Sequence, residues 1–334
     1  MRVLVTGGAG FIGSHFVRHL LRAHPEYEVI NLDKLTYAGN PANLADVVTA
    51  PRYRFVHGDI CDARLVFEVM RGCDAVVNLA AESHVDRSIQ DAGDFIRTDV
   101  GGTWVLLEAA RAHRVARYLQ VSTDEVYGSI TAGAFRETDP LRPSSPYAAS
   151  KAGGDHMVLA YGTTHRMPVL ITRASNTFGP NQYPEKVIPL FITNALDDTP
   201  LPLYGDGRHV RDWLYVLDHV AALDLVLHEG SEGEVYNVGG SHEIENIALT
   251  RRILAFLEKP ESLIRPATDR PGHDRRYAVD TTRLRALGWA PAHAFDAALA
   301  ATVTWYRTHE AWWRPLKSGE FLAYYRRQYG SSDR

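Results

Sequence analysis

The sequence has little cysteine and no long apolar run. Cys61 and Cys73 are its two cysteines among 334 residues, and they form no CxxC pair, no zinc-ligand set and no disulfide framework. We therefore expect two packed thiols and a reducing, cytoplasmic location. The N-terminus, MRVLVTGGAGFIG, lacks the charged and apolar regions of a signal peptide, and no run approaches the ~18 apolar residues of a membrane span. We expect neither a targeting segment nor a membrane partner.

The sequence also lacks an excess of positive charge. Lys and Arg number 36 against 40 Asp and Glu, for a net charge of −4. Such a balance argues against a surface for polyanions, so we expect no nucleic-acid partner. The apolar fraction of 45% and the charged fraction of 23% are typical of a folded globular protein.

Short β-branched segments alternate with longer amphipathic segments in the first half of the chain. This is the pattern of βαβ units in a parallel sheet. Strands are predicted at Arg2–Thr6, Tyr27–Asp33, Tyr53–His57, Ala75–Leu79, Arg117–Ser122 and Pro168–Arg173. Helices are predicted at Phe11–Ala23, Asp62–Arg71, Phe95–His113 and Pro146–Thr164. The fold class is therefore α/β, with a Rossmann-type doubly wound parallel sheet.

This alternation ends after Asn176, where Gly-Pro at 179–180 and several further prolines interrupt the chain. Glu234–Val238 is strand-like again, so the chain is expected to return to the sheet. We assign residues 1–176, rejoined by about 212–241, to a dinucleotide-binding domain. Residues 177–211 and 242–330 are expected to form a smaller, interleaved α/β domain that determines ligand specificity.

Three glycines, Gly7, Gly10 and Gly13, have GxxGxxG spacing between the first strand and the first helix. A dinucleotide site needs glycine for a tight turn and close backbone approach, and the free N–H groups of the helix N-terminus attract the diphosphate. An ordinary strand–helix turn is the alternative. Asp33 follows Gly13 by 20 residues, where a carboxylate would accept hydrogen bonds from the adenosine ribose, which favours NAD over NADP. The alternative is that the neighbouring cation, Lys34, accommodates the ribose phosphate of NADP.

Asp59 and Ile60 follow the third strand and would reach the adenine edge. The alternative is that Asp59 caps the next helix.

Tyr147 and Lys151 are four residues apart and project from one helix face. A phenol has a pKa near ~10, and a neighbouring ammonium with an oxidised nicotinamide would favour its phenolate, which could then act as a base. With the glycine motif and Ser122-Thr123, this pair resembles the extended short-chain dehydrogenase/reductase superfamily.

Two adjacent carboxylates, Asp124 and Glu125, follow Thr123. A redox step needs neither of them, whereas an elimination needs one group to deliver a proton and another to remove one. A solvent-exposed acidic turn is the structural alternative. Together with LAAESHVDRS at 79–88, LTYAGN at 35–40 and RPGHDRRY at 270–277, these residues make the chain similar to the dTDP-glucose 4,6-dehydratase family.

That resemblance implies an NAD-dependent hydro-lyase of deoxysugar biosynthesis, which converts dTDP-glucose to dTDP-4-keto-6-deoxyglucose. Tyr147 would take the C4 hydroxyl proton while hydride leaves C4, with Thr123 on the C4 oxygen and Lys151 holding the ribose. Glu125 would remove the C5 proton and Asp124 would protonate the departing C6 hydroxyl. Hydride would then return to C6, so that NAD+ is regenerated.

The resemblance also implies the binding residues, and no metal site. For the cofactor they are Gly7, Gly10, Phe11, Ile12, Gly13, Asp33, Lys34, Leu35, Thr36, Asp59, Ile60, Leu79, Ala80, Ala81, Ser83, Thr98, Tyr147, Lys151 and Thr177. For the substrate they are Ser83, Thr123, Asn176, Lys186, Val187, Pro202, Leu203, Tyr204, Arg211, Asn246, His273 and Tyr277. Of these, Arg211 is the best electrostatic candidate for a phosphate, and a salt bridge to Asp212 is the alternative.

The family commonly has Asn-Tyr-Gly-Pro after Asn176, whereas this chain has Thr177-Phe178-Gly179-Pro180. This departure could alter contacts near the nicotinamide or sugar but removes no acid–base group. The family also implies a homodimer built from paired long helices, in which Trp104, Leu107 and Tyr161 occupy the corresponding stretches.

Two other functions are weighed against the dehydratase. A nucleotide-sugar 4-epimerase would use the same Tyr147, Lys151 and retained NAD, but it has no use for Asp124 and Glu125. A non-catalytic dinucleotide sensor would need none of these four side chains.

Overall fold

The fold is described from a computed structural model that covers residues 1–330. Within these residues a parallel sheet has the strand order β10-β6-β5-β4-β1-β2-β3. Its strands are β1 (Arg2–Thr6), β2 (Glu28–Asp33), β3 (Tyr53–His57), β4 (Ala75–Asn78), β5 (Arg117–Thr123), β6 (Val169–Ala174) and β10 (Val235–Val238). The order reverses between β1 and β4, and ligands bind at such a reversal, outside the carboxyl ends of the strands.

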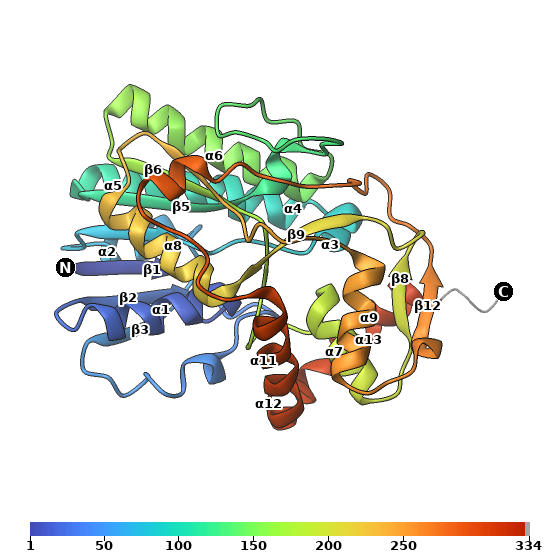
Figure 1. The fold of residues 1–334 in the computed structure, drawn as a ribbon. Helices are drawn as coiled ribbons and strands as arrows, with labels where there is room; N and C mark the ends of the chain where they lie inside the picture. The colour runs from blue at the N-terminus through green and yellow to red at the C-terminus, as the bar shows by residue number, and fades with distance from the viewer. Residues whose placement is uncertain (331–334) are drawn as a thin grey trace.

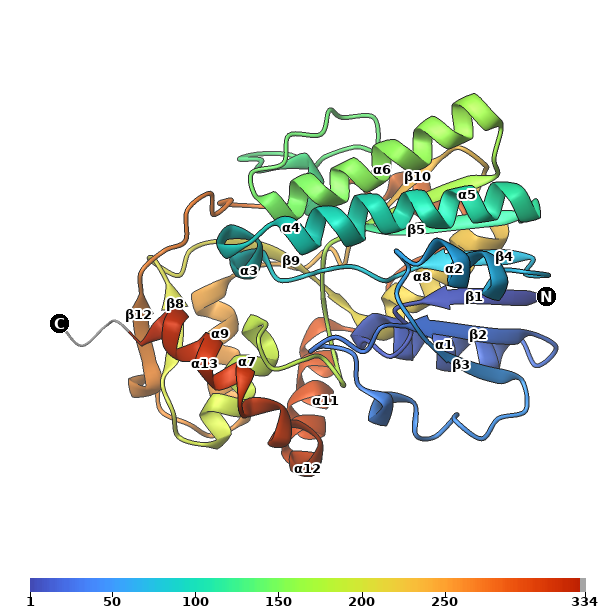
Figure 2. The same ribbon diagram turned by 180° about the vertical axis from the view of Figure 1, so that it is seen from behind.

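Helices cover both faces of this sheet (Figure 1, Figure 2). One face carries α1 (Phe11–Ala23) and α8 (Val216–Glu229), and the other carries α2 (Ala63–Val69), α5 (Thr103–His113) and α6 (Pro146–His165). Because strand side chains alternate, Val3 and Val5 of β1 pack in one core while Leu4 packs in the other. All three are completely buried, which fixes the central strand between two apolar layers.

A second group of elements lies beyond the carboxyl ends of the strands, on the side of the sheet away from the N-terminus (Figure 1, Figure 2). It contains a sheet of β7 (Asn176–Phe178), β9 (Val210–Tyr215) and β11 (Glu243–Glu245), and a pair of β8 (Leu201–Tyr204) and β12 (Ile264–Ala267). Its main helices are α7 (Val187–Leu196), α9 (Asn246–Phe256), α11 (Phe295–Thr308), α12 (Glu310–Trp313) and α13 (Glu320–Tyr329). Aromatic side chains from the tail, including Tyr306 and Trp313, fill its core.

Shorter elements join these layers. They are α3 (Val85–Gln90), α4 (Gly93–Phe95), a π-helical turn (Ile96–Gly102), α10 (Thr282–Ala286), and 3-10 turns at Pro41–Leu44, Asp124–Tyr127, Glu261–Leu263 and Pro315–Lys317. Among residues 1–330 there is no helix with both the length and the apolar character needed to span a membrane. Cys61 is half-buried, Cys73 is buried, and both are free thiols.

The predicted strands are confirmed, including the return of the chain as β10, and the α/β fold class is confirmed with them. The single helix predicted over Phe95–His113 is wrong at its start, where the π-helical turn Ile96–Gly102 precedes α5. At Gly102 a Cβ would come within 2.4 Å of Ile60 Cδ1, so a larger residue there would require the Ile60 side chain to move.

One structural alternative is excluded, and one further detail differs from the sequence-based expectation. Asp62, and not Asp59, caps α2, since its carboxylate accepts hydrogen bonds from Arg64 and Leu65 N–H. Leu284 and Trp289, which the sequence division places in the second region, pack into the core of the main sheet. Apolar composition alone does not say which of two cores a short helix such as α10 joins.

Candidate active site

The glycine motif forms a tight turn between β1 and α1. Gly7 has a φ of +69°, and a Cβ there would lie 2.7 Å from the Ala80 nitrogen. A Cβ on Gly13 would lie 2.2 Å from the Gly7 oxygen, so the helix start packs directly on the turn. The N-cap of α1 is Gly10, and no side chain caps the helix. Its first N–H groups are therefore open to an anionic ligand such as a diphosphate.

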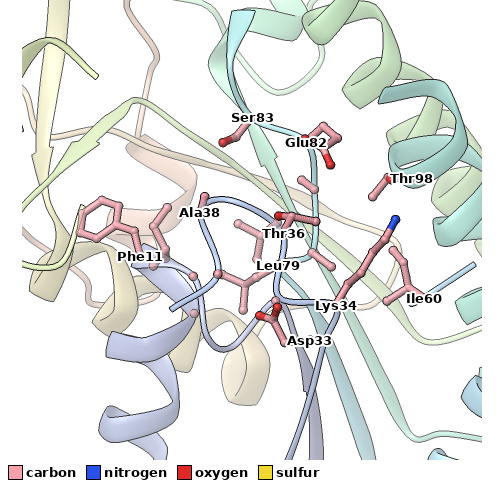
Figure 3. Close-up of a pocket in the computed structure, with 18 of the residues that line it drawn as sticks. Phe11, Asp33, Lys34, Thr36, Ala38, Ile60, Leu79, Glu82, Ser83 and Thr98 are labelled. Atoms are coloured by element: carbon pink, nitrogen blue, oxygen red, sulfur yellow. The ribbon is translucent and has the colours of Figure 1, made fainter. Parts of the chain in front are cut away.

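A cavity of about 240 Å³ lies at this turn, between the carboxyl ends of β1, β2 and β4 (Figure 3). Every predicted cofactor residue except Leu35 and Thr177 lines this cavity. Leu35 instead donates its backbone N–H to Asp33 Oδ1 at 2.8 Å. Asp33 Oδ2 accepts a second hydrogen bond from Ala9 N at 2.8 Å, and burial raises the pKa of this carboxyl. Asp33 thus joins the glycine turn to the loop after β2.

Lys34 forms an ion pair with Asp59, with 2.9 Å between Nζ and Oδ2. Asp59 also accepts a hydrogen bond from Cys61 N at 2.9 Å, and these contacts lower the pKa of its carboxyl although burial acts in the opposite direction. Lys34 is therefore already paired with a carboxylate and is not a free cation for a ribose phosphate. The glycine turn, the uncapped helix and Asp33 fit NAD better than NADP.

A second cavity of about 300 Å³ adjoins the first. Both are lined by Phe11, Ile12, Ser83, Val121, Ser122, Tyr147, Gln182, Glu185 and Lys186. All predicted substrate residues except Tyr277 line the second cavity. Thr177 lines this cavity too, and not the first, and its hydroxyl lies 2.9 Å from His219 Nδ1. Phe178, the other departure from the family pattern, is buried in the aromatic core and lines neither cavity.

Tyr147 and Lys151 lie in the first turns of α6. Ser145 is the N-cap of this helix, and its hydroxyl accepts a hydrogen bond from Ala148 N at 3.1 Å. The buried ammonium of Lys151 donates to the Val121 carbonyl oxygen at 2.8 Å. Burial raises the pKa of Tyr147 well above its usual value, Glu125 raises it further, and a hydrogen bond with Thr123 opposes this. The phenol therefore carries its proton until positive charge is brought to the site.

Asp124 and Glu125 begin a 3-10 turn directly after β5. The Thr123 hydroxyl caps this turn by accepting a hydrogen bond from Glu125 N at 3.2 Å. Asp124 is only 3% exposed, its Oδ2 atom has no hydrogen-bond partner within residues 1–330, and Glu125 is partly exposed. Both line the second cavity beside Tyr147, so the exposed acidic turn considered above is wrong for Asp124.

Burial raises the pKa of Asp124 well above its usual value, and the charges of Glu125 and Asp212 raise it further. A carboxyl in this environment keeps its proton near neutral pH and can donate it. The neighbouring Glu125 is the more open of the two carboxyls. The two adjacent carboxyls therefore lie in different environments.

Two buried cations, Arg211 and Lys186, also line the second cavity. Arg211 donates to the carbonyl oxygens of Val210 and Asp274, each at 2.8 Å, and Lys186 donates to the Ser83 carbonyl oxygen. Within residues 1–330, neither forms an ion pair with a carboxylate; Asp212, the alternative partner of Arg211, accepts from His242 N at 2.6 Å instead. Burial lowers the pKa of both cations, which an anionic ligand would reverse.

Tyr277 lies behind Arg211 and not in the cavity wall. Its ring centroid is 4.2 Å from Arg211 Cζ, and its hydroxyl donates to Asp274 Oδ2 at 2.7 Å.

Several lining residues were missed by the sequence analysis, among them His84, Asp86, Glu185 and Arg270. Arg270 Nη1 lies 3.2 Å from Asp86 Oδ1. His84, Asp86 and Arg270 lie inside the motifs at 79–88 and 270–277. These motifs could therefore have identified the three residues as part of the site, whereas Glu185 lies outside both.

A Rossmann sheet with Tyr147 and Lys151 beside a dinucleotide turn defines an enzyme of the short-chain dehydrogenase/reductase class. Residues 4–302 match the GDP-mannose 4,6 dehydratase family, and the chain belongs to that family. It is 53% identical to the dTDP-glucose 4,6-dehydratase of Streptomyces niveus over 95% of this chain and 96% of that protein.

Solved structures agree with this placement. DesIV, the dTDP-glucose 4,6-dehydratase of Streptomyces venezuelae with NAD and TYD bound, has a TM-score of 0.93 and 55% identity, covering 95% of this chain and 100% of that one. The UDP-glucose 4-epimerase of Thermus thermophilus in complex with NAD has a TM-score of 0.86 and 34% identity, covering 92% of this chain and 100% of that one. Because a dehydratase and an epimerase share this fold, the side chains must distinguish them.

Proposed function

We propose that this protein is a dTDP-glucose 4,6-dehydratase, a hydro-lyase that converts dTDP-glucose to dTDP-4-keto-6-deoxyglucose and water. The reaction consists of oxidation at C4, elimination of water across C5 and C6, and return of the hydride to C6. One observation carries the proposal: Asp124 and Glu125 line the second cavity together with Tyr147, which also lines the first. Oxidation at C4 requires a base such as Tyr147. Only the elimination of water requires the two further carboxyls of Asp124 and Glu125.

The first cavity fits NAD+. The glycine turn and the start of α1 would hold the diphosphate, and Asp33 would hold the adenosine ribose. Bound NAD+ supplies a hydride acceptor and donor, and the positive charge of its oxidised ring. Lys151, held by the Val121 carbonyl oxygen at 2.8 Å, would bind the nicotinamide ribose on the side of α6 that carries Tyr147.

The residues of the second cavity divide the proton transfers among them. Tyr147 takes the C4 hydroxyl proton and Thr123 donates a hydrogen bond to the C4 oxygen. Once C4 is a ketone, the C5–H bond is acidic, and Glu125 removes that proton. Asp124, whose pKa is raised by burial, protonates the C6 hydroxyl as it leaves.

The remaining lining residues would hold the rest of the substrate. Arg211 and Lys186, buried without a carboxylate partner within the described residues, would bind the diphosphate. Ser83 and Asn176 would contact the sugar and its first phosphate. Val187, Pro202, Leu203, Tyr204, Asn246 and His273 would hold the nucleoside.

Proton exchange at C5 distinguishes the proposal from a 4-epimerase. Glu125 removes the C5 proton and a solvent proton replaces it, so product formed in D2O should carry one deuterium at C5. An epimerase oxidises and reduces C4 alone and incorporates no deuterium at C5. Nuclear magnetic resonance of the sugar ring reads this directly, and a non-catalytic sensor would leave the substrate unchanged.

A cytoplasmic homodimer belongs to the same proposal. The free thiols of Cys61 and Cys73 support a reducing compartment. Trp104 on α5 is 49% exposed and offers an apolar contact, but Leu107, also expected at the interface, is fully buried inside the subunit core. Sedimentation of the wild-type protein and of Trp104→Glu tests the dimer, which should dissociate in the variant.

A further inference from the structure

Arg87 is a half-buried cation of the LAAESHVDRS motif to which the proposed reaction gives no role. Its guanidinium carbon lies 3.9 Å from the ring centroid of Tyr37 and 4.9 Å from that of Tyr324. Its Nη1 atom pairs with Glu320 at 2.9 Å, and its Nε atom lies 3.4 Å from Glu185 Oε2. One side chain thus joins the loop after β2, the segment before α7, and α13.

Tyr37 and Glu185 complete this contact on the cavity side. The Tyr37 hydroxyl donates to Glu185 Oε1 at 2.9 Å, and its ring also meets Tyr183 edge-on at 5.3 Å. The Glu185 side chain is 2% exposed. Its Oε1 atom accepts the hydrogen bond from this phenol, whereas its Oε2 atom faces Arg87 Nε at 3.4 Å and His84 Nε2 at 3.9 Å without a hydrogen bond within residues 1–330. A hydrogen bond to a buried carboxylate is among the stronger ones in proteins.

The contact joins two parts of the wall of the cofactor cavity. Thr36, Ala38 and Gly39, on either side of Tyr37, line that cavity, and Glu185 lines both cavities. Figure 3 shows the loop that carries Thr36 and Ala38 beside Asp33 and Lys34. The hydrogen bond between Tyr37 and Glu185 therefore holds a loop that forms part of the wall of the cofactor cavity.

We propose that Arg87 is a positioning residue that clamps the 35–40 loop through Tyr37 and Glu185, and that this clamp retains NAD+ between turnovers. The inference rests on the proposed function, in which NAD+ is regenerated in every turnover and need not dissociate between turnovers. The stacked, planar guanidinium suits this role, because a lysine ammonium could pair with Glu185 but could not stack between two rings in the same way.

The test measures exchange of bound NAD+ against an excess of isotopically labelled NAD+, followed by mass spectrometry of the protein-bound fraction. Tyr37→Phe removes only the hydroxyl, and Arg87→Lys keeps the charge. Tyr37→Phe should release NAD+ about tenfold faster than wild type, the effect of one hydrogen bond to a charged group. Arg87→Lys, which loses the stacking between two rings, should also release NAD+ faster than wild type. Tyr325→Phe, which loses a phenol hydroxyl bonded to Asn194 on the far side of α13, is the matched control and should exchange at the wild-type rate.

A second readout separates retention from general damage. The two clamp variants should unfold at nearly the wild-type temperature, lose activity on dilution, and recover it when NAD+ is added. Wild-type exchange in either clamp variant, or acceleration in Tyr325→Phe, would overturn the proposal. Because exchange is measured without substrate, it is independent of whether dTDP-glucose is dehydrated, so failure of the clamp and failure of the proposed reaction are distinguishable.

Discussion

The ammonium of Lys151 lies 2.8 Å from the carbonyl oxygen of Val121. This hydrogen bond joins α6, which carries Tyr147, to β5, which leads into Thr123, Asp124 and Glu125. Tyr147 lines both cavities, and the residues proposed for elimination line the second. The two parts of the proposed chemistry, oxidation at C4 and elimination across C5 and C6, therefore meet in the second cavity.

Replacing Asp124 by asparagine should uncouple these two parts. Asp124→Asn keeps the side-chain size but cannot donate the proton to the C6 hydroxyl, so water loss should slow by about 10²–10⁴-fold. Oxidation at C4 should continue, and reduced nicotinamide should accumulate, visible as near-ultraviolet absorbance in a stopped-flow experiment. Asp296→Asn, at an exposed carboxylate that pairs with Arg252, is the control. Wild-type turnover in Asp124→Asn would show that this residue is not the acid.

Freeing Lys34 should weaken the preference for NAD+. Asp59→Asn removes the carboxylate that pairs with Lys34 at 2.9 Å, leaving an ammonium free to meet a ribose phosphate. The ratio of Kd values for NADP+ and NAD+, measured by calorimetry on cofactor-free protein, should fall about fivefold, equivalent to roughly 1 kcal/mol. The double variant Lys34→Gln with Asp59→Asn should restore the ratio. An unchanged ratio in Asp59→Asn would contradict this role of the Lys34 ion pair.

Alanine at Gly7 should destabilise the fold more than alanine at another glycine of similar backbone conformation. Gly7 and Gly233 have φ values of +69° and +81°, but a Cβ meets Ala80 N at 2.7 Å in the first and nothing within 4 Å in the second. Gly233→Ala should cost about 1–2 kcal/mol of unfolding free energy, and Gly7→Ala distinctly more. Urea denaturation measures both, and equal losses would contradict the close packing of the glycine turn.

Glu82 should make the cofactor-free protein less stable as pH rises. Burial and nearby Asp99 raise its pKa to about 7, so the native state binds more protons than the unfolded state between about pH 4.5 and pH 7. Stability is therefore lost as pH rises through that window and stays constant above it. The loss should be about 1–3 kcal/mol smaller in Glu82→Gln. Parallel stability–pH curves for the two proteins would show that Glu82 does not titrate in this way.

The sequence predicts the cofactor residues of the first cavity well, because most of them lie at the carboxyl ends of strands in one parallel sheet. The glycine turn, Asp33 and Leu79–Ala81 each follow a strand of the same sheet, so their position along the chain determines their place at its edge. Tyr147 and Lys151 are predictable for a similar reason, since helix periodicity sets their shared face.

The second cavity depends on contacts that spacing does not reveal. Arg270 pairs with Asp86 across 184 positions of the chain, and Arg211 shields Tyr277 from the cavity although both belong to polar motifs. At the end of the π-helical turn before α5, Gly102 lies against the Ile60 side chain. In each instance the deciding partner is distant in sequence, and only packing identifies it.

The mass of the product tests the central claim most directly. The purified protein, given dTDP-glucose and no added NAD+, should form a product lighter than the substrate by one water, and Glu125→Gln should form it far more slowly. A product of unchanged mass, differing only at C4, would contradict the account and identify an epimerase.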